Sequence, residues 1–199
     1  MTRIIGGSAG GRRISTPRGV TTRPTSDRVR EALFSAVESW CGSLAGLRVL
    51  DLYAGSGAVG LEARSRGAGV VTLVEHDRRT ARLIADNIRA LNFHKQVEVV
   101  IGAVAATLAR APRAPYDLVF SDPPYPLSTP EVDRDLAALA EHGWLVPGAM
   151  VVLERGSRGE DPTWPDGITG VRHKKYGESV LWYGHAAGSD QDPSPQEGD

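Results

Sequence analysis

Cysteine is almost absent from this chain, and long apolar runs are missing altogether. Cys41 is the only cysteine, which excludes an internal disulfide and a metal site built from several cysteines. No apolar run approaches the roughly 20 residues that a membrane-spanning helix needs, and the first residues form no long apolar signal region. We therefore expect a soluble, cytoplasmic protein with no membrane partner and no bound metal. The sequence does not fix the oligomeric state, for which a monomer is our default.

The length and the charge pattern indicate one domain with appendages. At 199 residues and 41% hydrophobic, the chain can bury one sizeable core. The net charge of -1 hides a basic start and an acidic end. We divide the chain into a basic arm at 1–23, a main domain at 24–185 and a tail at 186–199 that we expect to be disordered. The acidic residues of the tail are Asp190, Asp192, Glu197 and Asp199.

The basic arm combines arginine with short runs of β-forming residues around a glycine-rich turn. This pattern predicts a β-hairpin that docks on the main domain or orders on a ligand. A basic segment is typical of proteins that contact nucleic-acid phosphates. Coding bias is the alternative, because lysine occurs only at Lys95, Lys174 and Lys175 and arginine is the general basic residue. The candidates for RNA contact are Arg3, Arg12, Arg13 and Arg18.

The stretch Asp122-Pro123-Pro124-Tyr125 follows a run that reads as a buried strand, and the rest of the chain is organised around it. Neither proline can donate to a sheet ladder, so the strand must end there and the prolines hold the neighbouring groups in a preset relation. The Asp122 carboxylate and the Pro123 carbonyl can accept the two N–H groups of an exocyclic amine, while Tyr125 stacks on its ring. A simple turn is the alternative interpretation.

A second motif is a strand at 47–53, followed by a glycine turn at 54–60 and a helical run. A strand, a glycine turn and a helix bring backbone N–H groups close to a nucleotide-type ligand. The next strand, at 70–74, ends in Glu75, an acid placed to hold ribose hydroxyls. The glycines also match the dinucleotide fingerprint, so a nicotinamide dinucleotide and S-adenosylmethionine compete as cofactors. The candidates for cofactor contact in this turn are Ala54, Gly55, Ser56 and Gly57.

Asp51, just before the glycine turn, favours S-adenosylmethionine. Its carboxylate would repel a pyrophosphate but can meet the positively charged amino group of a methionine moiety. A purely structural aspartate is the alternative. Arg23 and Thr25 precede the first helix and can reach an anionic ligand, although Thr25 also reads as a simple helix cap. Ala103, in the loop after the third strand, can lie against the adenine ring of the cofactor.

The remaining pattern alternates helices with strands. We expect a helix that starts near Thr25-Ser26-Asp27 and ends near Trp40, one from Asp77 through Asn92, and one capped by Thr129. The other expected elements are strands at 97–101, 116–121 and 150–153, a short helix at 104–108 and a closing hairpin at 171–176 and 179–183. Repeated βα units predict an α/β fold with a parallel sheet, helices on both faces, and ligands at the carboxyl ends of the strands.

In combination, these motifs resemble those of the class I S-adenosylmethionine-dependent methyltransferases that modify exocyclic amines of nucleobases. The amino-terminal block Arg23-Pro24-Thr25 with Asp27-Arg28-Val29-Arg30-Glu31, and the ending Tyr176-Gly177-Glu178-Ser179, resemble the RsmD-type 16S ribosomal RNA guanine-N2 methyltransferases more closely. The likeness covers essentially residues 3–183.

The resemblance implies a Rossmann-like fold with a mostly parallel seven-stranded sheet. It also implies methyl transfer to N2 of one guanine of 16S ribosomal RNA, guanine-966 in the family's usual description, in the assembling small ribosomal subunit. Asp122, Pro123 and Tyr125 are then the catalytic residues, and Asp122 also borders the cofactor. Two other functions remain open. The same stretch suits a DNA adenine or cytosine amino-methyltransferase, although 199 residues leave no room for a sizeable recognition domain, and the glycine turn alone suits a nicotinamide-dependent oxidoreductase.

Overall fold

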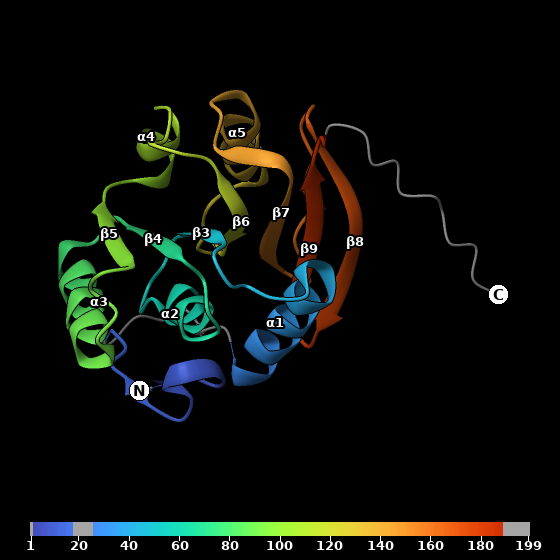
Figure 1. The fold of residues 1–199 in the computed structure, drawn as a ribbon. Helices are drawn as coiled ribbons and strands as arrows, with labels where there is room; N and C mark the ends of the chain where they lie inside the picture. Colours follow the sequence, from blue (N-terminus) through green and yellow to red (C-terminus); the bar gives the residue numbers. More distant parts are fainter. Residues whose placement is uncertain (1, 18–25, 189–199) are drawn as a thin grey trace.

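The computed structural model describes residues 2–17 and 26–188, in which a seven-stranded sheet forms the centre of the molecule (Figure 1). The strand order is β5-β4-β3-β6-β7-β9-β8. Strands β3 to β7 run parallel, whereas β9 pairs antiparallel with both β7 and β8. The strands are β3 (Arg48–Leu52), β4 (Val70–Glu75), β5 (Val97–Ile101), β6 (Tyr116–Ser121), β7 (Leu145–Gly156), β8 (Ile168–Tyr176) and β9 (Ser179–Ala186). The predicted α/β fold is confirmed.

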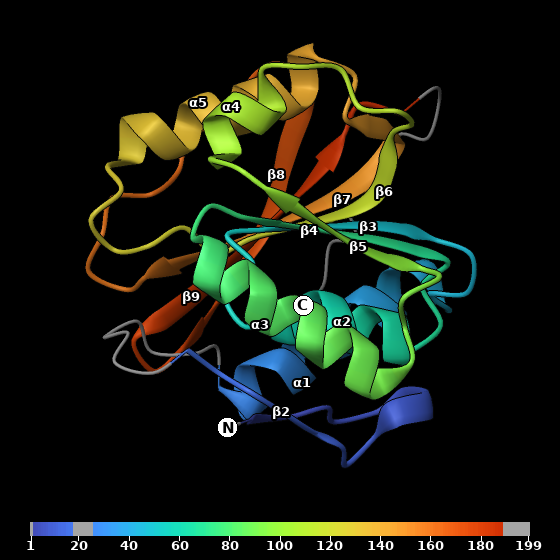
Figure 2. The ribbon, with the colours of Figure 1, turned by 90° about the vertical axis from the view of Figure 1, so that its left-hand side faces the viewer.

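Helices cover both faces of the sheet, as Figure 2 shows along the sheet edge. One face packs against α1 (Asp27–Cys41), α2 (Ala58–Ser65) and α3 (Arg78–Leu91). The other packs against α4 (Val104–Leu108) and α5 (Thr129–Glu141). The central strands are apolar on both faces, because a parallel sheet between two helical layers has no side in water. None of the helices within the described residues is long and apolar enough to cross a membrane.

Side chains that cap the helices explain where these helices begin. Ser26 caps α1, and its hydroxyl accepts the Val29 N–H at 3.3 Å, within the predicted start. Asp77 caps α3 as predicted. The predicted cap of α5 was wrong by one residue: Ser128, not Thr129, is the cap. The reason is that Ser128 and Glu131 form a reciprocal capping box, which fixes the start one residue earlier.

The described part of the basic arm, residues 2–17, forms the predicted antiparallel hairpin, although its strands β1 (Thr2–Arg3) and β2 (Arg13–Ile14) have only two residues each. A short 3-10 helix, η1 (Gly7–Ala9), lies between them. The arm is docked rather than projecting: it runs beneath α2 in Figure 2, and its apolar side chains are buried. Those side chains are Ile4, Ala9 and Ile14. Such short strands cannot hold themselves together, so the hairpin depends on the main domain.

Polar contacts fix the arm to α1 and α2. The fully buried Glu62 of α2 accepts the N–H groups of Ile5 at 2.7 Å and Gly6 at 2.8 Å. The equally buried guanidinium of Arg30 in α1 donates to the Arg3 carbonyl at 2.8 Å. Gly7 has a φ of +75°, and a Cβ there would lie 1.9 Å from the Ser65 carbonyl oxygen, so only glycine fits at this contact.

Candidate active site

A pocket of about 860 Å³ opens at the carboxyl ends of the central parallel strands. Its walls come from the ends of β3, β4, β6 and β7, the loops that follow these strands, the arm, the amino-terminal parts of α2 and α3, and the start of β9 (Ser179). Among the predicted site residues, the lining includes Asp51, Ala54, Gly55, Ser56, Glu75, Asp122, Pro123 and Tyr125. Three stretches that lie far apart in sequence therefore meet in one cavity, at the sheet edge where parallel folds place their ligands.

The other predicted site residues lie elsewhere. Gly57 does not line the pocket; it precedes α2 in a left-handed conformation with φ +77° and ends the turn whose earlier residues do. Ala103 precedes α4 and also lies outside the pocket lining. Arg18, Arg23 and Thr25 lie outside the described residues.

Glu75 ties together the loops that follow β3 and β4. Its carboxylate accepts the Gly55 N–H at 3.0 Å and the Asp77 N–H at 2.8 Å. A Cβ built on Gly55 would meet only the Tyr53 carbonyl oxygen, at 3.9 Å, so this backbone is open to close approach by a ligand. The pocket thus has an uncrowded glycine backbone next to an acid, which is the arrangement that holds a nucleoside.

Asp51 lines the pocket and is only 2% exposed. It accepts the Gly60 N–H at 2.9 Å. Burial raises the pKa of Asp51 to about 7; the Gly60 hydrogen bond opposes this shift, and the nearby charge of Glu75 adds to it. The protein therefore provides little to stabilise the negative charge of this carboxylate. A cationic ligand in the pocket would provide the missing stabilisation.

This raised pKa predicts how stability responds to pH in the cofactor-free protein. Between about pH 4 and 7 the folded protein keeps a proton on Asp51 that the unfolded chain has lost, so this group makes stability fall as the pH rises. Asp51→Asn keeps an acceptor for Gly60 and carries no charge. We expect the variant to lose stability less steeply over this range and to exceed the wild type at pH 8 by up to about 4 kcal/mol.

Urea unfolding of both proteins at pH 5 and pH 8, without cofactor, measures this effect. Asp86→Asn is the matched control, because Asp86 is 68% exposed and its removal should leave the pH dependence unchanged. Parallel pH profiles for Asp51→Asn and the wild type would contradict the raised pKa.

The Asp122 stretch begins where β6 ends. The Asp122 N–H still points to the Leu52 carbonyl of the neighbouring strand, at 3.5 Å, and the Leu127 N–H donates to the Pro124 carbonyl at 2.9 Å. Pro123 is buried, whereas Tyr125 is 60% exposed at the rim of the pocket. The Tyr125 ring passes close to Gly156, where a Cβ would lie 3.1 Å from the ring. A flat ligand can therefore reach the exposed tyrosine ring.

Several pocket residues carry no motif and were missed from the sequence. Tyr53 adopts a left-handed φ of +60°, rare for a residue other than glycine, and its hydroxyl donates to the buried carboxylate of Asp135 in α5. Burial and this contact raise the pKa of the Tyr53 hydroxyl, and burial raises the pKa of Asp135. The end of β7 adds Glu154 and Arg155, and Arg155 donates to the Leu127 carbonyl at 3.1 Å. The contact between Tyr53 and Asp135 joins elements more than 80 residues apart, which only the folded chain reveals.

The arm carries the described RNA-contact candidates on its surface. Arg3 is exposed and lies 3.4 Å from Asp27. Arg12 is exposed and donates to the Ala90 carbonyl, and Arg13 is exposed. Thr2 and Thr16 of the arm line the pocket, so these arginines belong to a segment that reaches the pocket wall.

Residues 2–185 match the family described as Conserved hypothetical protein 95, which is the RsmD family. The chain belongs to this family. An RsmD-family relative, "Ribosomal RNA small subunit methyltransferase D" of Escherichia coli strain K12, is 35% identical over 177 residues, which are 88% of this chain and 85% of the relative. "Putative rRNA methyltransferase YlbH" of Bacillus subtilis strain 168 is 30% identical and covers 88% of this chain and 94% of its own length.

Solved structures agree with membership of the RsmD family. "Putative methyltransferase yhhF from Escherichia coli" superposes with a TM-score of 0.83 at 31% identity and covers 94% of this chain and 98% of its own. The predicted Rossmann-like methyltransferase class is thereby confirmed, and with it S-adenosylmethionine as the cofactor.

Proposed function

We propose that this protein transfers a methyl group from S-adenosylmethionine to the exocyclic N2 amine of one guanine in the RNA of the small ribosomal subunit. The position is guanine-966 of 16S RNA in the family's usual description, and the substrate is the assembling subunit. One observation carries the proposal: the Asp122 stretch, which suits an aromatic amine, and the open glycine turn beside Glu75 line the same pocket. The printed name of the Escherichia coli relative supports the RNA of the small subunit as the substrate.

The cofactor fits the residues on the β3 and β4 side of the pocket. Asp51 is a buried carboxylate with a raised pKa, and the ammonium group of the methionine moiety would favour its charged form. The open backbone at Gly55 and the carboxylate of Glu75 would hold the ribose and its hydroxyls. When bound, S-adenosylmethionine supplies an electrophilic methyl group on a positively charged sulfur.

Asp122 and Pro123 would prepare the amine for attack. A guanine amine is a poor nucleophile because its lone pair is delocalised into the ring. Hydrogen bonds from its two N–H groups to the Asp122 carboxylate and the Pro123 carbonyl would orient the amine and aim the lone pair at the methyl carbon. Tyr125 would stack on the extruded base.

The protein does not need a strong base for this reaction. Nitrogen forms its bond to carbon as the carbon–sulfur bond breaks, and the amine becomes acidic only during that step. Asp122 can hold the departing proton through its hydrogen bond, and water removes it afterwards.

The test is transfer of labelled methyl from S-adenosylmethionine to unmethylated small-subunit particles, free 16S RNA and duplex DNA in parallel. The nucleosides are identified after digestion. We expect N2-methylguanosine from particles or RNA. Label only in DNA amines would replace the proposal with a DNA amino-methyltransferase, and no label with normal cofactor binding would refute the proposed substrate.

Salt dependence tests whether the arm grips RNA. Each phosphate contact contributes about 0.7–0.9 to the log–log slope of affinity against salt concentration. For a variant in which Arg3, Arg12, Arg13 and Arg18 are all alanine, we therefore expect the slope to flatten by about 3. Arg134→Ala, an exposed arginine on α5 on the other face of the sheet, is the control and should change the slope little. An unchanged slope in the quadruple variant would reject the arm as the RNA grip.

A further inference from the structure

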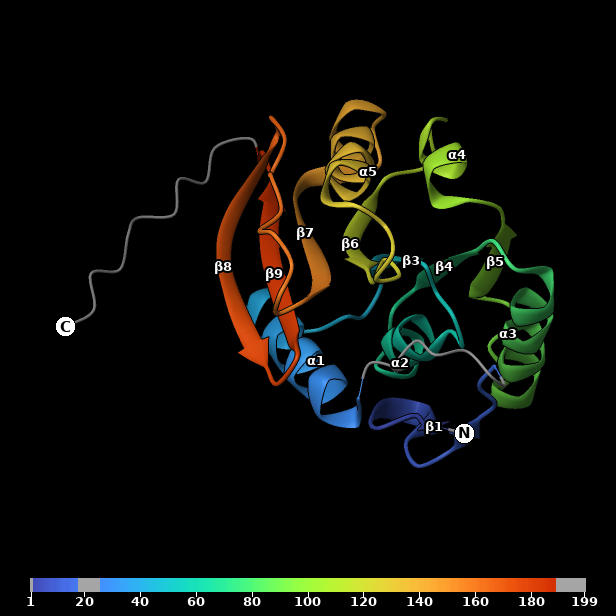
Figure 3. The ribbon, with the colours of Figure 1, turned by 180° about the vertical axis from the view of Figure 1, so that it is seen from behind.

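The pocket extends beyond the cofactor residues to a second wall at the end of β7. This wall contains Glu154, Arg155 and Gly156, with Ser179 from the adjoining end of β9. Figure 3 shows β7 and β9 side by side, on the opposite side of β6 from β4. If the cofactor lies against β3 and β4, the acceptor base lies between Asp122 and this wall.

The strand register brings Glu154 of β7 close to the end of β6, where Asp122 follows. Leu118 of β6 pairs with Met150 of β7, and Phe120 pairs with Val152. All four side chains belong to the core on the side of α1, α2 and α3. Because side chains alternate along a strand, Glu154, two residues beyond Val152 in β7, continues that face. Asp122 directly follows the last residue of β6 and lines the same pocket as Glu154.

The same face also holds Asp51 of β3, whose backbone pairs with Phe120 and whose side chain lines the pocket. Three of the carboxylates that line the pocket therefore lie in or directly after the neighbouring strands β3, β6 and β7. Proposed roles already exist for Asp51, at the cofactor, and for Asp122, at the amine. Glu154 is a buried acid, 7% exposed, in the wall next to the amine site, and the proposed mechanism does not use it.

We propose that Glu154 is the residue that selects guanine, by accepting the N1–H of the target base while Asp122 and Pro123 hold its N2 amine. This inference rests on the proposed function. On the Watson–Crick edge of guanine, N1–H and the N2 amine are neighbouring donors, and two acidic side chains on neighbouring strands match this pair. Tyr125 would hold the ring between them.

The same carboxylate would reject the other amino bases. Next to the exocyclic amines of adenine and cytosine, the ring nitrogen is an acceptor without a proton. A carboxylate oxygen facing that lone pair would leave two acceptors opposed, and a site built to pair with a donor discriminates strongly against a base that lacks it. A glutamine at this position would offer an N–H donor to such a nitrogen.

Glu154→Gln, tested with 2-aminopurine, separates this role from a structural one. 2-Aminopurine keeps the N2 amine but has an unprotonated N1 and no O6. It is placed by ligation at the guanine that the wild type modifies, and kcat/KM is measured for both RNAs with both enzymes. For each enzyme, the preference is the kcat/KM for the guanine RNA divided by that for the 2-aminopurine RNA. The loss of O6 affects both enzymes alike, so it cancels when the two preferences are compared.

We expect the variant to lose about 10–100-fold in kcat/KM on guanine, the effect of removing a hydrogen bond to a charged group. We also expect its preference for guanine over 2-aminopurine to narrow at least about tenfold. Its affinity for S-adenosylmethionine should match that of the wild type. Glu154→Asp, which keeps the charge, should retain the guanine preference even if turnover falls, and the exposed Glu160→Gln should behave as the wild type.

An unchanged preference in a folded Glu154→Gln variant would overturn the inference. So would a Glu154→Asp variant that loses the preference while still binding cofactor. Failure of the proposed function would give a different result. The wild type would then produce no N2-methylguanosine from any RNA, and the proposed role of Glu154 would be refuted as well.

Discussion

Asp122→Ala should lower methyl transfer by at least about 100–1,000-fold while cofactor affinity changes little. The side chain stands where β6 ends, and it would provide one of the two acceptors for the target amine. Without it, the amine keeps a single partner at Pro123 and no longer points its lone pair at the methyl group. Loss of one preorganised polar contact at a reacting centre typically costs this much in turnover. Single-turnover transfer to small-subunit particles measures the loss, and calorimetry with S-adenosylmethionine measures binding.

Two further variants make this result specific. Asp122→Asn keeps one oxygen acceptor but adds an N–H group that faces the amine, so it should be nearly as impaired as the alanine variant. Asp161→Ala removes an exposed carboxylate outside the pocket and should leave transfer unchanged. Turnover within tenfold of the wild type in Asp122→Ala would remove Asp122 from the mechanism.

Most of the fold could be predicted because local rules agree with the tertiary structure. Apolar runs of five or six residues that alternate with amphipathic segments define β5 and β6 with the bounds that the structure shows. The cap at Asp77 follows the same local logic. At α5, two local signals competed, and the capping box of Ser128 with Glu131 prevailed over Thr129.

The site residues that could be predicted from the sequence belong to local motifs. Those that could not be predicted reach the site only through the pairing of distant strands. Asp122 precedes two prolines, and Asp51 precedes a glycine turn, so both stand out in the sequence. Glu154 ends an ordinary apolar run, and nothing near it in the sequence marks it as functional. It becomes notable only when β7 pairs with β6 in the observed register and carries it to the pocket that Asp122 lines.

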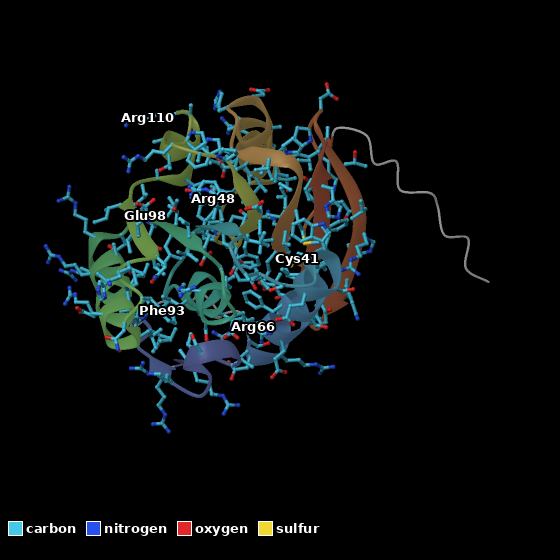
Figure 4. The ribbon with its side chains drawn as sticks, in the orientation of Figure 1. Cys41, Arg48, Arg66, Phe93, Glu98 and Arg110 are labelled. Atoms are coloured by element: carbon cyan, nitrogen blue, oxygen red, sulfur yellow. The ribbon has the colours of Figure 1, made fainter. Side chains whose placement is uncertain are left out.

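Docking of the arm was predicted only in general terms, because the side chains that hold it, Glu62 of α2 among them, carry no motif in the sequence. Glu62 sits between Leu61 and Ala63 and reads from the sequence as a solvent-exposed helical residue. In the fold it is fully buried and accepts three hydrogen bonds, from Ile5, Gly6 and the Arg66 guanidinium. Arg66 lies beside α1 and α2 in Figure 4 and also contacts Glu38 at 2.8 Å, so the arm, α1 and α2 share one charged centre.

Glu62→Ala should therefore lower the free energy of unfolding by about 3–5 kcal/mol, the usual cost of breaking a buried, hydrogen-bonded ion pair by removing one partner. Two backbone N–H groups of the arm and the largely buried Arg66 guanidinium lose an acceptor together. We also expect the arm to detach, which would remove Thr2 and Thr16 from the pocket wall and weaken RNA binding. Urea unfolding measures the stability, and limited proteolysis reports release of the arm.

The matched control is Glu38→Ala, which removes the other carboxylate that contacts Arg66. Glu38 is 42% exposed, whereas the Glu62 side chain is fully buried, so water replaces much of what the guanidinium loses. We expect the control to cost at most about 1 kcal/mol and to leave the arm protected. Equal losses of unfolding free energy in the two variants would mean that burial does not make the contact of Glu62 with Arg66 stronger than that of Glu38. A Glu62→Ala protein that loses stability but keeps a protected arm would show that the remaining contacts, the buried apolar side chains of the arm and its hydrogen bonds to Arg30 and Ser65, suffice to hold it.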